Sequence, residues 1–315
     1  MAGTRFFNRK RAAIVLPALL GLGGVLVCVA GLEVYLLSLF LLVPFLVSLL
    51  ASFIWSAEKD PSFGSCYVVS LQSLLLLSGL ILLLAIDGLI CMIMATPLIG
   101  VVALAGAWAG NVMASCRRGN TLAGLLFLTF PFAVGFEYSA TDSEPDLRQV
   151  TTSVEIDAPI EVVWNTVIAF PKIEEPPSGI FRLGIAYPIE ASIEGTGVGA
   201  IRSCTFSTGS FIEPITRWEE PHLLAFDVTE NPPPMKEISP YGDLHATHLH
   251  GFMVSDRGQF ALREQDGRTI LEGTTWYSHR IAPQFYWGAI SDEIIHRIHS
   301  RVLEHIRDHA EDVGR

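Results

Sequence analysis

Three histidines stand within six residues in the second half of the chain, in the stretch HATHLH at residues 245–250. Imidazole nitrogens are common ligands of zinc and iron. In an extended chain His248 and His250 share a face, whereas in a helical turn His245 and His248 do, and His279 would add a third ligand. No HExxH pattern, cysteine pair or close carboxylate spacing supports such a site. The sequence leaves three interpretations open: a metal site, a polar rim that contacts a ligand, and ordinary surface histidines.

Ionisable side chains in strand-like runs are the candidates for acid–base catalysis. His279 and Glu272, both within RTILEGTTWYSHR, form the pair that we consider first, as base and orienting carboxylate. A charged group that faces an apolar interior has a shifted pKa, which suits proton transfer. Arg202, Glu213 and Asp227 are further candidates. Because one sequence does not set the strand register, and no nucleophile elbow, Walker loop or dinucleotide fingerprint occurs in the required context, the catalytic residues stay unassigned.

Charge divides the chain into two halves. Residues 1–136 contain seven Lys or Arg and four Asp or Glu, a net charge of +3, whereas residues 137–315 contain 14 and 28, a net charge of −14. A domain this acidic, without a basic patch, is not expected to bind nucleic acid. We expect the second half to be exposed to water, to bind a neutral, apolar or mildly cationic molecule, and to need no cofactor.

The first half predicts membrane-spanning helices, because about 20 apolar residues in a helix cross the hydrocarbon core of a bilayer. Uncharged runs of that length cover residues 12–32, 34–56, 61–86 and 88–116. A fifth run, residues 119–136, contains Pro131 and Gly135, which could break a helix. A cleaved signal peptide explains the start less well, since apolar character resumes directly after Glu33. The sequence therefore predicts four or five spans.

Basic residues in the loops predict the orientation. Four Lys or Arg precede the first span, Lys59 follows the second, and Arg117 follows the fourth, while the connections at Glu33 and Asp87 have no basic residue. The positive-inside rule then places the N-terminus in the cytoplasm, in a cell inner or plasma membrane. The second half is extracytoplasmic with five spans and cytoplasmic with four. Glu33 and Asp87 are expected to be loop residues.

The second half is predicted to form a domain over residues 150–315, after an acidic linker at residues 137–149. It begins with a strand, QVTTSVEIDAP, followed by a helix, PIEVVWNTVIAF, in which Pro159 suits the first turn. Five strand-like runs divided by turn residues follow, and GTGVG at residues 195–199 is expected to be a hairpin turn. A helix over residues 284–311 completes an α+β fold.

Four pieces of this domain resemble a known group. They are VEIDAPIEVVWNTVIAFPKI, GVGAIRSCTF, WEEPHLLAFDV and EGTTWYSHR, and they resemble START-like, helix-grip domains of the polyketide cyclase/dehydrase and lipid transport group (SRPBCC). The resemblance covers residues 150–312 and implies an antiparallel sheet wrapped around the long C-terminal helix, with an apolar cavity between them. It says little of activity, since the group includes lipid carriers, ubiquinone-associated proteins, cyclases, hydrolases and allergens. The fused membrane region departs from the usual single-domain form and argues against a soluble shuttle.

Apolar spacing in the last helix predicts which of its sides faces the cavity. At about 100° per residue, with Ile298 as the origin, the apolar stripe contains Trp287, Ser291, Ile294, Ile295, Val302 and Ile306. His305 and His309 lie close to this stripe and are expected to cover the end of the sheet. We predict that a ligand binds between sheet and helix at Trp164, Trp287, Ser291, Ile294, Ile298 and Val302.

Three functions are compatible with this sequence. The first is a membrane-anchored module that binds a hydrophobic molecule such as a lipid, quinone or polyketide-like compound. The second is a membrane-tethered enzyme, of cyclase or hydrolase type, acting on such a molecule. The third is a structural or regulatory membrane component without a ligand, whose cavity is filled by its own side chains.

Overall fold

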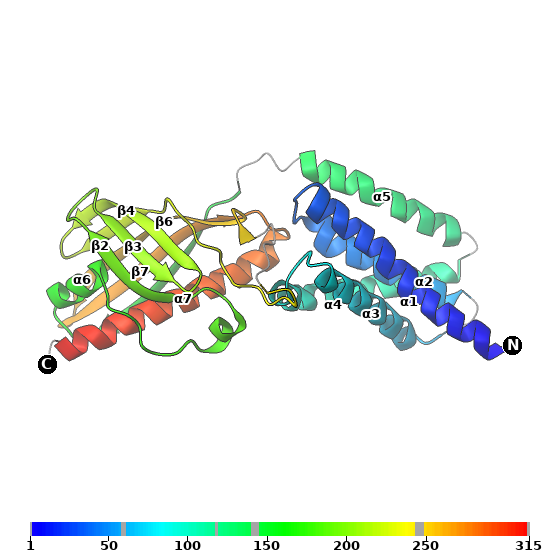
Figure 1. Cartoon of the computed structure of the whole chain (residues 1–315), viewed down its shortest axis with the longest axis horizontal. Helices are drawn as coiled ribbons and strands as arrows, with labels where there is room; N and C mark the ends of the chain where they lie inside the picture. Colours follow the sequence, from blue (N-terminus) through cyan, green and yellow to red (C-terminus); the bar gives the residue numbers. More distant parts are fainter. Residues whose placement is uncertain (1, 58–60, 117–118, 140–144, 243–248, 314–315) are drawn as a thin grey trace. The chain divides into compact units, whose positions relative to one another are not determined.

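The computed structural model describes residues 2–57, 61–116, 119–139, 145–242 and 249–313, of which 2–8 and 119–127 are described as backbone (Figure 1). The chain forms two compact units. The helical unit comprises Met1–Glu144, Glu237–Thr247 and Ile281–Tyr286, and the grip unit comprises Pro145–Lys236, His248–Arg280 and Trp287–Arg315. Two short segments from the second half of the sequence therefore belong to the helical unit.

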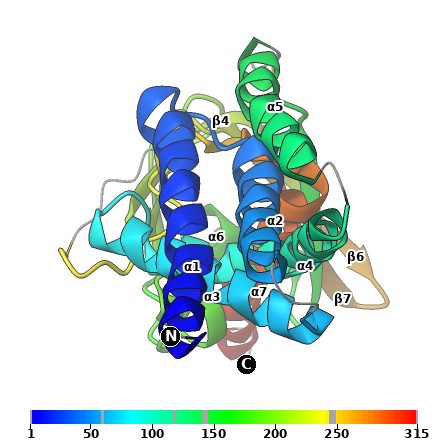
Figure 2. The same ribbon diagram turned by 90° about the vertical axis from the view of Figure 1, so that its right-hand side faces the viewer.

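The uncharged runs of the first half form long helices (Figure 2). They are α1 (Ala2–Leu26) with a π-helical turn at Val27–Gly31, α2 (Val43–Ser56) preceded by a π-helical turn at Ser38–Leu42, α3 (Phe63–Leu83) and α4 (Leu89–Ala114). By length and composition, four helical stretches are suited to crossing a membrane: Arg9–Gly31, Ser38–Ser56, Phe63–Leu83 and Leu89–Ala114. They coincide with the first four predicted spans.

The fifth apolar run forms one helix, α5 (Gly119–Ser139), so Pro131 and Gly135 do not break it. The helix also continues into the stretch predicted as a linker. Glu137 explains why α5 extends this far: its carboxylate oxygens accept hydrogen bonds from the backbone N–H of Ser38 at 3.1 and 3.0 Å. A backbone N–H at the start of a helix lacks an intrahelical partner and favours a negative charge.

Small residues allow α2 and α4 to pack closely. A Cβ atom on Gly106 would lie 2.4 Å from the Phe45 carbonyl oxygen, and one on Gly110 would lie 2.1 Å from the Leu49 carbonyl oxygen. Gly100, on the same helix, has no atom within 4 Å of the corresponding position. Two glycines of α4 are therefore required by the close approach of α2, and the third is not.

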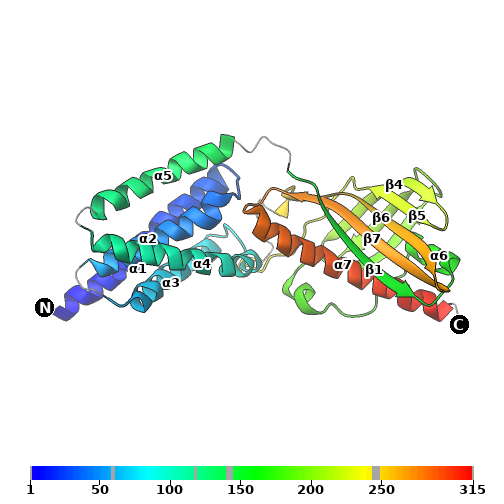
Figure 3. The ribbon, with the colours of Figure 1, turned by 180° about the vertical axis from the view of Figure 1, so that it is seen from behind.

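The grip unit contains a seven-stranded antiparallel sheet that curls around α7 (Figure 3). The strand order is β1-β7-β6-β5-β4-β3-β2, so successive strands from β2 to β7 are neighbours and β1 pairs with β7. This arrangement confirms the predicted α+β class and helix-grip fold. The elements are β1 (Arg148–Ile156), α6 (Ile160–Ile168), the 3-10 helix η3 (Gly179–Leu183), β2 (Pro188–Glu194), β3 (Ile201–Phe206), β4 (Gly209–Glu219), β5 (Leu223–Asp227), β6 (Met253–Gln265), β7 (Arg268–His279) and α7 (Gln284–Val313).

Local sequence explains the turns and the first helix of this unit. Gly195, Gly197 and Gly199 have φ angles of +89°, +82° and +91°, which glycine adopts without steric cost, and they join β2 to β3. The GTGVG stretch is therefore the predicted hairpin turn. Pro159 precedes the first residue of α6, and the apolar side of α6 is buried against the sheet and α7.

Candidate functional site

The side of α7 that faces the sheet overlaps the predicted stripe and extends beyond it. Its buried residues are Trp287, Gly288, Ile295, Val302, Leu303, Ile306 and Ala310. On a wheel of about 100° per residue, their mean direction lies about 70° from Ile298, the origin of the angles. Leu303 and Ala310 were left out of the stripe, whereas Ile298 is only partly buried. The apolar spacing therefore predicted four of the buried residues and missed the others, because small and polar residues also face the sheet.

The six predicted ligand-binding residues are divided between the core and its margin. Ile294 and Ile298 lie on α7 between the side that faces the core and the side that carries Arg297 and Arg301. Both are half-buried, as this position requires. The six are Trp164 and Val302 in the core, Ile298 packed against the core, Trp287 buried near the start of α7, and Ser291 and Ile294, which are half-buried.

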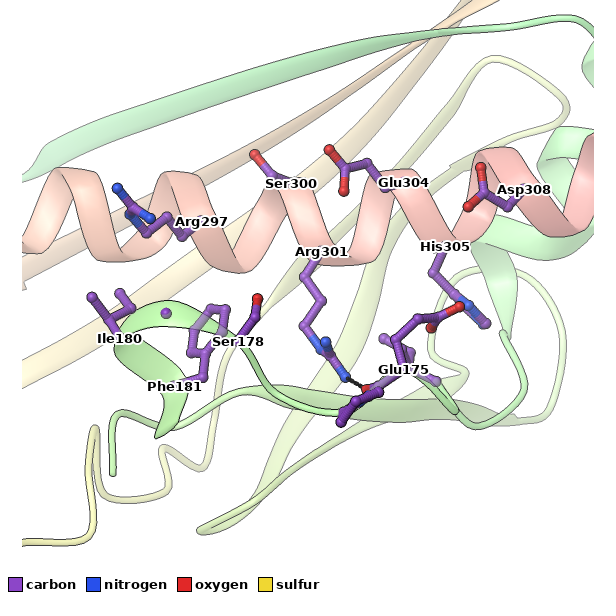
Figure 4. A pocket seen from close by; sticks show the side chains of 13 residues that line it. Glu175, Ser178, Ile180, Phe181, Arg297, Ser300, Arg301, Glu304, His305 and Asp308 are labelled. Atoms are coloured by element: carbon purple, nitrogen blue, oxygen red, sulfur yellow. Dashed lines mark hydrogen bonds between the residues drawn. The ribbon is translucent and has the colours of Figure 1, made fainter. Parts of the chain in front are cut away.

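A pocket of about 360 Å³ lies between α7 and residues 173–181 (Figure 4). This volume is within the range of about 300–1,000 Å³ that small-molecule sites occupy. None of the six predicted residues lines it. The chain segment contributes mainly apolar groups and α7 contributes polar ones; the lining residues are Ile173, Glu175, Pro176, Ser178, Gly179, Ile180 and Phe181 from the segment, and Arg297, Ser300, Arg301, Glu304, His305 and Asp308 from α7.

Two side chains of α7 hold the segment in place. Arg301 donates to the backbone oxygens of Glu175 at 2.6 Å and Pro188 at 3.4 Å. His305 donates from Nε2 to the Pro171 carbonyl oxygen at 3.1 Å, and its ring lies 5.8 Å from that of Phe170. His305 therefore fixes the start of the pocket wall, a role that the helical wheel did not indicate.

Two of the catalytic candidates form a buried ion pair. Arg202 on β3 and Glu213 on β4 are cross-strand partners, with 1% and 6% of their surface exposed. The Arg202 guanidinium lies 5.4–5.8 Å from the centres of three phenylalanine rings, Phe170, Phe226 and Phe260. Burial raises the pKa of the Glu213 carboxyl, and the positive charge of Arg202 opposes that rise. The third candidate, Asp227, is exposed.

The predicted pair of His279 and Glu272 is not brought together. They lie seven residues apart on β7, which corresponds to roughly 23 Å at about 3.3 Å per residue, and an odd separation directs them to opposite faces of the sheet. His279 is buried and stacks on Tyr277, with ring centroids 6.3 Å apart. The Tyr277 hydroxyl donates to Asp292 on α7 at 2.6 Å, and Arg148 on β1 pairs with the same carboxylate.

A polar layer lies further along the interface between α7 and the sheet. The Thr152 hydroxyl on β1 lies 2.8 Å from Nδ1 of His296 and 3.2 Å from Nδ1 of His299. Nε2 of His299 lies 2.8 Å from the Thr275 hydroxyl on β7. Burial lowers the pKa of His299 to about 4, and the nearby His296 adds to this effect. His299 is therefore neutral near pH 7 and forms hydrogen bonds with both strands.

The predicted metal-binding histidines are mostly outside the part of the chain that the structure describes. His245 and His248 belong to residues 243–248, which are not described, and His250 is exposed. The three interpretations of HATHLH therefore stay open.

Among the described residues, Asp87, Cys91 and Glu237 bring potential ligand atoms within 4.8 Å of one another in the helical unit. The Glu237 carboxylate accepts hydrogen bonds from the backbone N–H groups of Ile90 and Cys91 at 2.9 and 3.0 Å. Burial raises the pKa of Asp87 to about 7; the Gly88 N–H opposes the rise and Glu237 adds to it. These contacts stabilise the N-terminus of α4. The sequence contains no signal for them, because Glu237 is far from α4 along the chain.

Comparisons with known proteins concern the fold. No protein-family model and no curated protein matches the sequence. The Zhui aromatase/cyclase from Streptomyces sp. R1128 is 14% identical with a TM-score of 0.36, over 54% of this chain and 97% of that chain. A point mutant of norcoclaurine synthase from Thalictrum flavum is 11% identical with a TM-score of 0.35, over 55% and 100%. Protein Ms6760 from Mycobacterium smegmatis is 19% identical with a TM-score of 0.30, over 52% and 94%. The sheet order and the position of α7 in the grip unit are those of the START-like helix-grip fold.

Proposed function

We propose that this chain is an integral membrane protein whose grip unit binds a hydrophobic or amphipathic small molecule, such as a lipid, a quinone or a polyketide-like compound. The observation that carries the proposal is the pocket of about 360 Å³ beside α7. One wall offers Ile180 and Phe181 to an apolar body, and the other offers Arg297 and Ser300 to a polar group. Sites of this kind combine apolar walls with a few polar groups that set the orientation of the ligand.

The predicted residues on α7 extend this site toward the core. Ile294 and Ile298 lie on the margin between the pocket side of the helix and its buried side. An apolar molecule that enters beneath residues 173–181 would bury surface against these isoleucines, at a gain of about 25 cal/mol per Å². The grip unit would then bind its ligand along the middle and second half of α7, with Ile294 and Ile298 at one end of the site.

We further propose that α5 is a fifth span and that the grip unit is extracytoplasmic. The continuity of α5 supports this proposal, as does the hydrogen bonding of Glu137, near the end of α5, to Ser38 at the start of the second span. If α5 crosses the membrane after the fourth span, the residues that follow it lie on the side opposite the N-terminus. The basic residues at Lys59 and Arg117 then stay on the cytoplasmic side, as the positive-inside rule requires.

Ligand retention tests the binding proposal. The full-length protein is purified from its own membrane, and its contents are released for native and denaturing mass spectrometry. We expect one recurring apolar species in near-stoichiometric amount. Ser300→Trp should fill the pocket and Ile294→Asp should place a charge at its margin, so both variants should lose the species. Val313→Trp, at a position of the same helix that is 64% exposed, is the matched control and should retain it.

The outcomes separate the three functions. Retention by both folded variants, or an empty wild-type protein, would contradict the proposal and favour a structural component. A species that is chemically converted during incubation would favour a membrane-tethered enzyme instead. In that case His279→Ala tests the sequence-based candidate, which does not line the pocket: lost conversion with persisting retention would assign His279 a catalytic role, and unchanged conversion would exclude it.

A further inference from the structure

We infer that the helical unit has an interfacial surface, formed by residues 237–242 and 281–286, that lies in the headgroup region of the membrane and contacts lipid directly. Both segments come from the second half of the sequence and belong to the helical unit. The inference rests on the membrane anchoring proposed above and is independent of any ligand in the pocket.

Hydrogen bonds attach the first segment to the connection between α3 and α4. The Leu89 N–H, at the start of α4, donates to the Ile238 carbonyl oxygen at 3.0 Å. The Tyr241 hydroxyl donates to the Leu83 carbonyl oxygen, at the end of α3, at 2.6 Å. Glu237 accepts from backbone N–H groups of the first turn of α4. The segment thus supplies partners to backbone groups that helix ends leave unsatisfied.

The second segment is attached at the same end of the bundle. The Ala282 N–H donates to the Tyr35 carbonyl oxygen, in the connection between the first two spans, at 2.9 Å. The Tyr286 hydroxyl donates to the Met94 carbonyl oxygen in α4. Successive antiparallel spans place the connections at residues 32–37 and 84–88 at one end. If the four helices cross the bilayer, both segments lie at the depth where the hydrocarbon core meets the headgroups.

The exposed side chains of these segments suit that depth. Ile238, Tyr241 and Phe285 have 49%, 61% and 74% of their surface exposed. Tyr241 lies beside Leu83 at the end of α3, which is also exposed. The only charged residue within residues 237–242 and 281–286 is Glu237, and it is buried. Exposed aromatic and aliphatic groups without charge are unfavourable in water, whereas tyrosine and apolar side chains are typical of membrane interfaces.

Photocrosslinking to lipid tests the inference. The full-length protein is reconstituted into nanodiscs of phosphatidylcholine and phosphatidylglycerol, with p-benzoylphenylalanine in place of one residue at a time. The test positions are Phe285 and Ile238, whose exposed side chains make replacement tolerable. Leu75, 71% exposed on α3, is the reference for a lipid-facing span, and Val198, 68% exposed in the hairpin of the grip unit, is the reference for water. Lipid adducts are quantified by mass spectrometry after irradiation.

We expect adducts at Phe285 and Ile238 to be several-fold more abundant than at Val198 and comparable with those at Leu75. Adducts at Leu75 combined with only the Val198 level at both test positions would overturn the interfacial surface and leave the membrane anchoring intact. An absence of adducts at Leu75 would overturn both. An empty pocket in the mass-spectrometry experiment would leave the expected lipid adducts unchanged, because the interfacial surface does not depend on the pocket.

Discussion

Two sets of charged side chains in the grip unit are paired, one buried and one about one third exposed. Arg202 pairs with Glu213 across adjacent strands, and Asp292 accepts from both Tyr277 and Arg148. A buried charge without a partner costs several kcal/mol, whereas a paired one is tolerated and fixes the relative position of its elements. Neither set lines the described pocket, so we regard both as structural and keep ligand contacts separate from them.

The hydrogen bonds of His299 predict a pH dependence of stability. The folded-state pKa is lowered to about 4 from an ordinary value of 6.5. Between these values the unfolded chain binds more protons, so the free energy of unfolding falls as the pH drops from 6.5 toward 4, by at most about 1.4 kcal/mol per pH unit. His299→Leu should flatten this dependence, measured as thermal unfolding of the full-length protein in detergent. His309→Leu, exposed on the same helix, should keep it; an equal slope in both variants would refute the assignment.

Two elements depend on close contacts that their own sequences do not specify. α7 presents a side to the sheet that includes His299 and Leu303, and the threonines of β1 and β7 supply hydrogen-bond partners to His299 there. α4 approaches α2 so closely that the backbone of α2 occupies the space of a side chain. In both elements the neighbouring element decides which residues are buried.

The contact of α4 with α2 predicts a contrast between two glycines. Gly110→Ala would place a methyl group against the backbone oxygen of Leu49, which cannot move as a side chain would, and overpacking typically costs about 1–3 kcal/mol. Gly100→Ala meets nothing within 4 Å and should leave stability unchanged or slightly raised. Thermal unfolding midpoints of the two variants in detergent provide the comparison. Similar midpoints would mean that α2 and α4 are not packed this closely.

At the scale of the whole molecule, a fifth span would decide on which side of the membrane the grip unit functions. With α5 as a fifth span, alkaline phosphatase fused after residue 145 should be active and a green fluorescent protein at the same position should be dark. Fusions after residue 57, between the second and third spans, should show the reverse. Fluorescence at residue 145 would mean that α5 does not cross and that the grip unit is cytoplasmic.

The sequence by itself determined the elements of this protein and their order. Uncharged runs of about 20 residues predict spans, and alternation with turn residues predicts strands, because both depend on which neighbouring residues are apolar. The hairpin at Gly195–Gly199 and the helix beginning at Gln284 follow from the same local patterns. Residue types alone also made Arg202 and Glu213 candidates for acid–base catalysis, without indicating that they pair.

Only the tertiary structure decided that the buried side of α7 extends to Leu303 and Ala310, that Arg202 meets Glu213, and that His279 and Glu272 stay apart. It alone joined Glu237 to α4 and Tyr286 to Met94, contacts between residues that are far apart in the chain. Such contacts leave no periodic signal, because each depends on the register of a strand or on the path of a loop and not on neighbouring residues. For the same reason, hydropathy separated the chain into two halves, whereas the folded chain places two segments of the second half in the helical unit.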